Sequence, residues 1–144
     1  MSHPRDILQV ATPFVWFGMV AAISLLETPL KFRAPGITLA LGLGIGRLVF
    51  RALNLIELVL LAVLTATFVG DAPTGVALML VLGLWVLLPL QAFVLRPLLD
   101  RRAQAIIDGN VPPPSRTHHL YIALELGKLL ALPALGVLLA GSLS

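Results

Sequence analysis

The chain alternates long apolar stretches with short polar ones, and this pattern predicts four membrane spans. The apolar stretches cover about residues 7–28, 46–69, 74–96 and 117–141. Each is close to the roughly 20 residues needed to cross a hydrocarbon core. The intervening polar stretches 29–45 and 97–116 contain the prolines and glycines that end helices. We therefore expect an all-α integral membrane protein, with residues 1–144 forming one four-span domain.

Each of these two polar stretches also predicts a short interfacial helix. Residues 37–46 are rich in glycine, which favours either close helix packing or an interfacial entry into the second span. Residues 97–108 predict a helix that Gly109 ends. We expect this second helix to be a solvated surface helix that contacts anionic lipid, with docking of a cytoplasmic partner as the alternative.

The composition agrees with a chain surrounded by lipid. Hydrophobic residues make up 58% of the sequence and charged residues 12%, against about 25% charged residues in soluble domains. The net charge is +3, but the basic residues lie beside the spans, where they meet lipid phosphates, so nucleic acid is not an expected partner. The absence of cysteine excludes disulfides, thiolate metal sites and cysteine nucleophiles. We expect the first span to be retained, because it is longer than the apolar core of a usual signal peptide.

The distribution of positive charge predicts the orientation. Arg5 is the only basic residue beside the termini and the second loop. The first and third loops and their flanks carry Lys31, Arg33, Arg47, Arg51, Arg96, Arg101, Arg102 and Arg116. By the positive-inside rule, loops 29–45 and 97–116 face the cytoplasm and both termini lie outside. The expected location is a bacterial inner membrane.

The fourth span carries charged residues within its apolar run. Glu125 and Lys128 are one helical turn apart, and at about 100° per residue His118 and Tyr121 lie on the same arc. A charged side chain at membrane depth normally faces protein or a water-filled cavity. We therefore predict a polar centre formed by Glu57, Glu125, Lys128, His118, Tyr121, Asn54, Gln91 and Glu27.

Structural and functional explanations of these residues both stay open. Glu125 and Lys128 could form an ion pair that fixes the rotation of the span, or they could lie on a path for protons, ions or substrate. Glu57 could pair with Arg51, His118 or Lys128, or it could accept a proton or bind a cation.

The basic residues around the second span also need partners. Arg47 and Arg51 are one turn apart and repel each other, so we expect acidic partners, with Glu27 and Glu57 as candidates and lipid phosphates as the alternative. The residues expected to contact lipid phosphate or a protein partner are Arg47, Arg51, Arg96, Arg101 and Arg102.

A shift of 68 residues aligns parts of the two halves of the chain. It places Pro29-Leu30 on Pro97-Leu98. It also places Glu57-Leu58 on Glu125-Leu126. If this is a duplication, the protein is a 2+2 repeat, and Glu57 and Glu125 face a shared centre.

The sequence predicts no catalytic residues and no cofactor. It contains no Ser-His-Asp order, P-loop or HExxH motif, so the chain is more readily explained as a non-enzymatic protein. His118 and His119 are the candidate metal ligands, but neighbouring residues on a helix point about 100° apart. A zinc or copper ion would need one histidine together with glutamate side chains. A haem held by one axial histidine is the alternative.

Three stretches carry a resemblance to known proteins: the first span WFGMVAAISLLETPLKFRAPG, the segment GRLVFRALN and the opening RTHHL of the last span. In outline the chain resembles small bacterial four-span inner-membrane families. These include a group of unknown function related to a human transmembrane protein implicated in heavy-metal resistance. HemJ-type haem-pathway oxidases and copper-resistance membrane domains share the format. A HemJ-type protein implies a histidine ligand on an early span, whereas the first three spans here contain none.

These observations lead to two main hypotheses of function. The first is a small membrane protein that binds or translocates a small solute, ion or lipid through the polar centre. The second is an accessory subunit or assembly factor of a larger membrane complex, and a membrane haem or redox protein is the third. The expected partners are membrane lipids together with further copies of the chain or another membrane protein.

Overall fold

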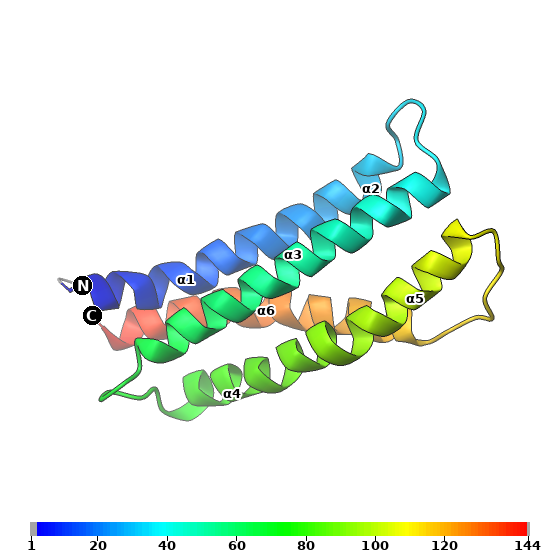
Figure 1. Cartoon of the computed structure of the whole chain (residues 1–144). Coiled ribbons are helices and arrows are strands. Elements are labelled where there is room, and N and C mark those ends of the chain that lie inside the picture. Colours follow the sequence, from blue (N-terminus) through cyan, green and yellow to red (C-terminus); the bar gives the residue numbers. More distant parts are fainter. Residues whose placement is uncertain (1–2, 144) are drawn as a thin grey trace.

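A computed structural model describes residues 3–143, and every regular element in that range is a helix. The elements are α1 (Pro4–Ala21), η1 (Ala22–Glu27), α2 (Thr28–Lys31), α3 (Leu39–Ala66), α4 (Gly75–Pro89), η2 (Leu90–Leu95), α5 (Arg96–Ile107) and α6 (Thr117–Ser142). Because α1, η1 and α2 are continuous, as are α4, η2 and α5, the chain forms four long helices. Both termini lie at one end, together with the α3–α4 turn (Figure 1).

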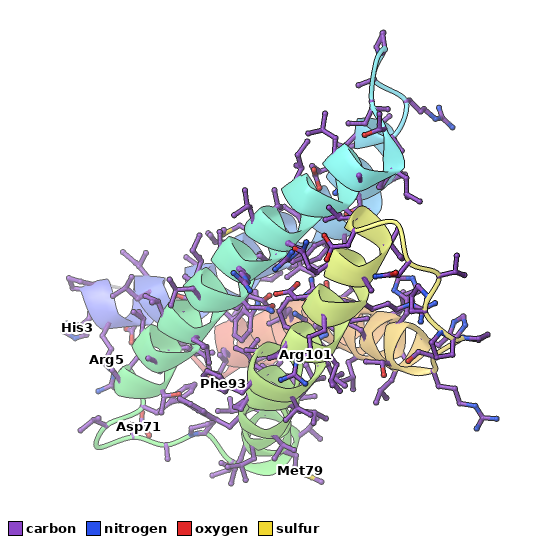
Figure 2. The ribbon with its side chains drawn as sticks, turned by 45° about the vertical axis from the view of Figure 1, so that its right-hand side comes forward. His3, Arg5, Asp71, Met79, Phe93 and Arg101 are labelled. Atoms are coloured by element: carbon purple, nitrogen blue, oxygen red, sulfur yellow. The ribbon has the colours of Figure 1, made fainter. Side chains whose placement is uncertain are left out.

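All four helices are long and apolar enough to cross a membrane. This confirms the prediction of an all-helical chain with four apolar helices. Large apolar side chains point away from the bundle, such as Met79, which is 72% exposed (Figure 2). Exposed apolar surface of this extent is typical of a protein covered by lipid.

Neither predicted interfacial helix is a separate element among residues 3–143. The glycine-rich segment is the first part of α3, which begins after Thr38, whose hydroxyl accepts a 3.1 Å hydrogen bond from the Leu41 N–H. The helix predicted in the third loop is α5, and it continues the third long helix. It ends at Ile107, and Gly109 follows with a φ of 88°, a conformation that glycine adopts without strain.

Two π-helical segments, η1 and η2, interrupt the long helices just before a proline. The Thr28 N–H bonds to the Ile23 carbonyl, and the Arg96 N–H bonds to the Gln91 carbonyl. Both are i→i+5 bonds, which define a π-helical turn. Pro29 and Pro97 come next, and a proline has no N–H to complete the α-helical pattern.

Helix α5 has one buried face and one exposed face, and its predicted contact with anionic lipid or a cytoplasmic partner stays a prediction. Leu99, Asp100 and Ala103 are buried where α5 packs against α3. Arg101, in contrast, is exposed. The reason is that α5 continues the third helix and crosses towards the start of α3 (Figure 1).

The bundle has two different halves. In the half nearer the termini, called the closed half here, α1 and α6 lie side by side (Figure 1). Its apolar core includes Val20, Leu61, Leu64, Leu84, Leu132, Leu135 and Leu139. In the other half, called the open half, α2 and the start of α6 diverge towards the first and third loops (Figure 1). The polar residues predicted to form a centre lie at and beyond the point where they part.

Candidate functional site

A buried ion network lies where the two halves meet. Lys128 Nζ is 2.5 Å from Glu57 Oε2 and 2.5 Å from Glu125 Oε1. The side chains of Lys128 and Glu57 are 0% exposed, and that of Glu125 is 7% exposed. One ammonium group on α6 is therefore shared by a carboxylate on α3 and a carboxylate on its own helix.

Hydrogen bonds from the other long helices complete this network. Trp16 on α1 donates its indole N–H to Glu57 Oε2 at 2.8 Å, and Gln91 on η2 donates to Glu125 Oε1 at 3.1 Å. Ser24 on η1 donates to Glu125 Oε2 at 2.6 Å. All four long helices thus contribute a side chain to the same cluster.

The network has both a charge imbalance and unused hydrogen-bonding capacity. Two carboxylates and one ammonium sum to −1 when all three groups are ionised. Glu57 Oε1, Gln91 Oε1 and Asn54 Nδ2 are buried without a partner within residues 3–143. Buried polar atoms in proteins are nearly always paired with protein or water, so these atoms are able to bond to water or a ligand.

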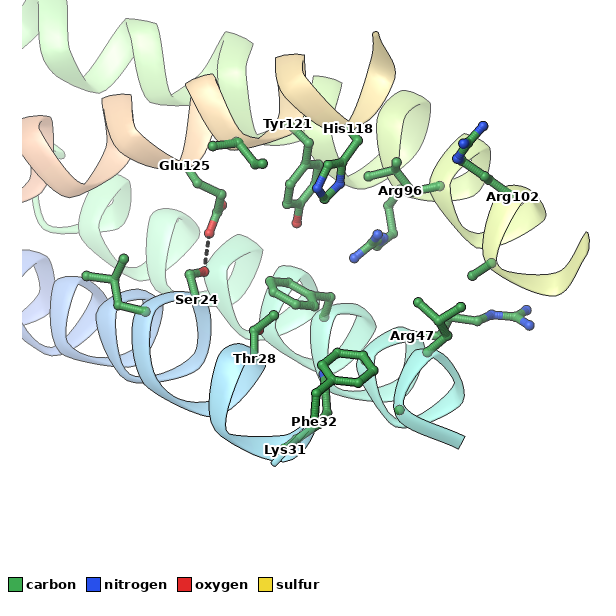
Figure 3. A pocket seen from close by; sticks show the side chains of 18 of the residues that line it. Ser24, Thr28, Lys31, Phe32, Arg47, Arg96, Arg102, His118, Tyr121 and Glu125 are labelled. Carbon is green, nitrogen blue, oxygen red and sulfur yellow. Dashed lines mark hydrogen bonds between the residues drawn. The ribbon is translucent and has the colours of Figure 1, made fainter. Parts of the chain in front are cut away.

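A cavity of about 650 Å³ opens beside the network in the open half. Side chains from η1, α2, α3, α5 and α6 line it. Figure 3 shows Glu125 and Ser24 joined by their hydrogen bond at its inner end. Glu125 therefore has one oxygen in the buried network and the other facing the cavity.

Four basic side chains line the outer part of this cavity: Lys31, Arg47, Arg96 and Arg102. Arg96 is the most tightly held of the three arginines. Its guanidinium carbon lies 5.2 Å from the centre of the Phe50 ring and 4.9 Å from the centre of the Tyr121 ring. Figure 3 shows this side chain pointing into the cavity, below His118 and Tyr121.

The acidic partners of the basic residues differ from those expected. Arg51 bonds to Asp100 at 2.8 Å, and Arg96 lies 3.4 Å from the same carboxylate. Arg47 bonds to the side-chain oxygen of Gln104. The expectation that Glu27 or Glu57 neutralises Arg47 and Arg51 is therefore wrong, because α5 supplies both partners: the buried carboxylate of Asp100 for Arg51 and the exposed, neutral side chain of Gln104 for Arg47.

Most of the predicted polar centre lies together. Glu57, Glu125, Lys128 and Gln91 form the network, and the Tyr121 hydroxyl bonds to Asn54 Oδ1 at 3.3 Å beside it. The two remaining predicted residues lie outside the network. His118 is exposed and lines the cavity, and Glu27 pairs with Lys31 at 3.5 Å.

Three important residues were not predicted from the sequence: Trp16, Ser24 and Asp100. Trp16 and Ser24 are eight residues apart with buried Val20 between them. This i, i+4, i+8 spacing on one helix face was the available signal. Asp100 is four residues from Arg96, but the composition of its segment favoured a solvated helix.

The two candidate metal ligands do not form a recognisable metal site. The rings of His118 and His119 have centroids 6.1 Å apart and are tilted by 60°. Within the described range 3–143, no group of three or more His, Cys, Asp or Glu residues is placed to hold a metal ion.

Comparison of the chain with models of known protein families, with curated proteins and with solved structures found no match. The resemblance to small four-span inner-membrane families therefore stays a prediction. Function has to be argued from the geometry of the site, since a helical bundle on its own does not specify an activity.

Proposed function

We propose that this chain is a non-enzymatic membrane protein that binds a small molecule in the open-half cavity and carries it into or across the bilayer. The observation that carries the proposal is the position of Glu125. One of its oxygens contacts Lys128 in the buried network, and the other contacts Ser24 at the cavity. A molecule that binds in the cavity beside Glu125 would therefore change the electrostatic interaction of this carboxylate with Lys128 in the buried network.

The chemistry of the surroundings supports this proposal. Charged side chains inside a membrane bundle are costly, so they most often mark a path for substrate, ions or protons. A cavity of about 650 Å³ falls within the size range of about 300–1,000 Å³ that is usual for small-molecule sites.

We also propose the predicted orientation and the 2+2 repeat. Loops 29–45 and 97–116 would face the cytoplasm, which places the cavity mouth on that side of a bacterial inner membrane. Two further features follow the 68-residue shift: η1 (Ala22–Glu27) corresponds to η2 (Leu90–Leu95). Glu57 corresponds to Glu125, and both carboxylates contact Lys128.

The test is native mass spectrometry of gently extracted protein. We expect a stoichiometric small-molecule adduct in the wild type and its loss in Ala103→Trp, because Ala103 lines the cavity. Ala62→Trp is the matched control, since Ala62 is exposed on α3 away from the cavity. An adduct that persists in Ala103→Trp contradicts the proposal.

Glu125→Gln and Glu57→Gln test the role of the network. Glutamine has nearly the shape of glutamate, so we expect both variants to fold and both to lose binding or transport. Circular dichroism checks the fold, and adduct occupancy checks binding. Unchanged occupancy in both variants contradicts the proposal.

A second candidate function, docking of a cytoplasmic protein, is favoured by one observation. Arg101 is exposed on α5, and no acidic side chain among residues 3–143 pairs with it. Arg101→Glu is therefore the docking variant, whereas Arg102 lines the cavity and serves a different test. Loss of a stoichiometric co-purifying protein in Arg101→Glu supports this candidate. The absorbance spectrum of the same sample tests the haem alternative.

A further inference from the structure

The cavity has two chemically different parts. Its outer part carries Lys31, Arg47, Arg96 and Arg102, and its inner end carries Glu125. Between them the wall is apolar and includes Leu25, Leu43, Leu99, Ile122, Leu126 and Leu129. A ligand that complements the basic outer part and the apolar wall needs an anionic group at one end and a hydrocarbon portion.

The basic residues at the mouth are only partly neutralised by the protein. Lys31 has Glu27 as its partner, and Arg96 has Asp100. Arg47 bonds to the neutral oxygen of Gln104, and Arg102 to the carbonyl of Pro113. In the described range, therefore, two arginines that line the cavity have no carboxylate within ion-pair distance.

Arg96 provides a third, preorganised donor. Its side chain is 13% exposed, and its Nε has no hydrogen-bond acceptor among the described residues, although Asp100 lies 3.4 Å away. The Phe50 and Tyr121 rings hold the guanidinium group in place. A buried guanidinium N–H without an acceptor is costly, so an anionic ligand oxygen would stabilise it.

The apolar wall is open on one side. Leu25 on η1, and Ile122 and Leu126 on α6, line the cavity and are 60%, 43% and 52% exposed. They lie where η1 and α6 part, on surface that faces hydrocarbon when the chain spans a membrane. An alkyl chain longer than the cavity can therefore extend between these helices into lipid.

We propose that the cavity binds a single-chain phosphate monoester, with the phosphate at Arg47, Arg96 and Arg102 and the hydrocarbon chain along the wall between η1 and α6. This inference rests on the proposed function. A phosphate monoester carries about −1.5 to −2 charges at neutral pH, which matches the two arginines without carboxylate partners. Each guanidinium group can donate two N–H bonds to two oxygens of the same phosphate. The phosphate therefore lies at the outer end of the cavity, away from the Glu125 carboxylate at the inner end.

The experiment measures binding of radiolabelled dodecyl phosphate to the protein in nanodiscs of phosphatidylcholine, with empty nanodiscs as background. We expect saturable binding of one molecule per chain. The double variant Arg47→Gln/Arg102→Gln should weaken binding roughly tenfold or more, because each lost charge-assisted hydrogen bond alone corresponds to about a tenfold change.

A matched pair removes the same charge from outside the cavity. Arg33 and Arg101 are exposed and do not line it, so Arg33→Gln/Arg101→Gln should change the affinity less than about twofold, as expected for removal of surface charge. Equal weakening by both double variants, or no saturable binding by the wild type, overturns the inference. The melting temperature of each variant confirms that it is folded.

Competition and cavity filling separate this inference from the proposed function. Inorganic phosphate should compete poorly, because it lacks the chain, and so should dodecylphosphocholine, because its phosphate is a diester. Competition by dodecylphosphocholine as strong as by dodecyl phosphate overturns the ligand class but leaves small-molecule binding intact. Equal competition by inorganic phosphate overturns the role of the apolar wall. Dodecyl phosphate binding that survives in Ala103→Trp overturns both proposals.

Discussion

The closed and open halves of the bundle are built from the same four long helices but are held together differently. In the closed half, apolar side chains such as Leu61 and Leu135 interdigitate, and α1 and α6 stay in contact. In the open half, basic side chains and a cavity occupy the space between the helices. Apolar packing is non-directional, whereas the bonds of Lys128 and Glu125 are directional. The ion network lies at the boundary between these two kinds of packing.

Removal of the shared ammonium group should have the largest effect on this boundary. Lys128→Met leaves Glu57 and Glu125 buried without a counter-charge, and breaking a buried ion pair costs about 3–5 kcal/mol. The measurement is the free energy of unfolding by denaturant in mixed micelles. A loss below about 1 kcal/mol, typical of exposed pairs, would show that apolar packing alone holds the boundary.

The two tryptophans should differ strongly in their contribution. Trp16 is 0% exposed and bonds to Glu57, whereas Trp85 is 38% exposed and bonds to Thr65. Trp16→Phe should lower the unfolding free energy by about 1.5–3 kcal/mol, because it removes a hydrogen bond to a charged group. Trp85→Phe should stay within about 0.5 kcal/mol, as surface substitutions usually do. Similar losses in the two variants, in the same unfolding assay, would contradict the comparison.

Two glycines, one in each half, test whether the two halves differ in how tightly their side chains are packed. A Cβ on Gly136 would lie 2.6 Å from Phe14 in the closed half, and one on Gly42 would collide with Phe32 beside the cavity. Alanine gains about 1 kcal/mol of helix propensity over glycine, but overpacking costs about 1–3 kcal/mol. Gly136→Ala should therefore lose about 1 kcal/mol, and Gly42→Ala should be near neutral because the Phe32 ring can move into the cavity. Thermal unfolding of both variants tests this, and an equal loss would argue against room for Phe32 to move.

A small effect should also come from the ion pair at the end of the closed half. Arg5 and Asp71 are 3.5 Å apart and both are exposed (Figure 2). Asp71→Asn should change the unfolding free energy by less than about 1 kcal/mol. Asp100→Asn is the contrasting variant, because this carboxyl group is 5% exposed and contacts Arg51 and Arg96. A larger loss for Asp71→Asn than for Asp100→Asn would reverse the comparison.

The number of helices followed directly from the apolar pattern, but two of their ends did not. Helix α3 begins at Leu39, several residues before the predicted span, and the third helix continues to Ile107. The glycines near the start of α3 look like helix breakers in the sequence. In the structure these glycines lie inside a continuous helix, where Gly42 packs against Phe32 and Gly46 lies close to Lys31.

The polar centre was predictable because a charge in an apolar span requires a partner. This cost is why the sequence alone identified Glu57, Glu125 and Lys128 as members of a buried polar cluster. Ser24 carries no such signal, since serine is common in membrane helices. The cavity could not be predicted either, because it depends on the divergence of η1 and α6, and the order of polar and apolar residues does not specify how far two helices separate.

The π-helical turn η1 also changes how its helix can be engineered. An i→i+5 turn accommodates one residue more than an α-helical turn, so the face presented after Glu27 is shifted by about 100° from that of an uninterrupted α-helix. Lys31 and Phe32 reach the cavity with this shifted phase. Deletion of one residue within Ala22–Glu27 would give a regular α-helix and leave Lys31 and Phe32 facing the cavity, because the π-helical turn already places them as if the segment were one residue shorter, and Trp16 and Val20 would keep their places in the core. The π-helical turn thus sets the angle about the helix axis between the residues that face the cavity and the residues that face the core.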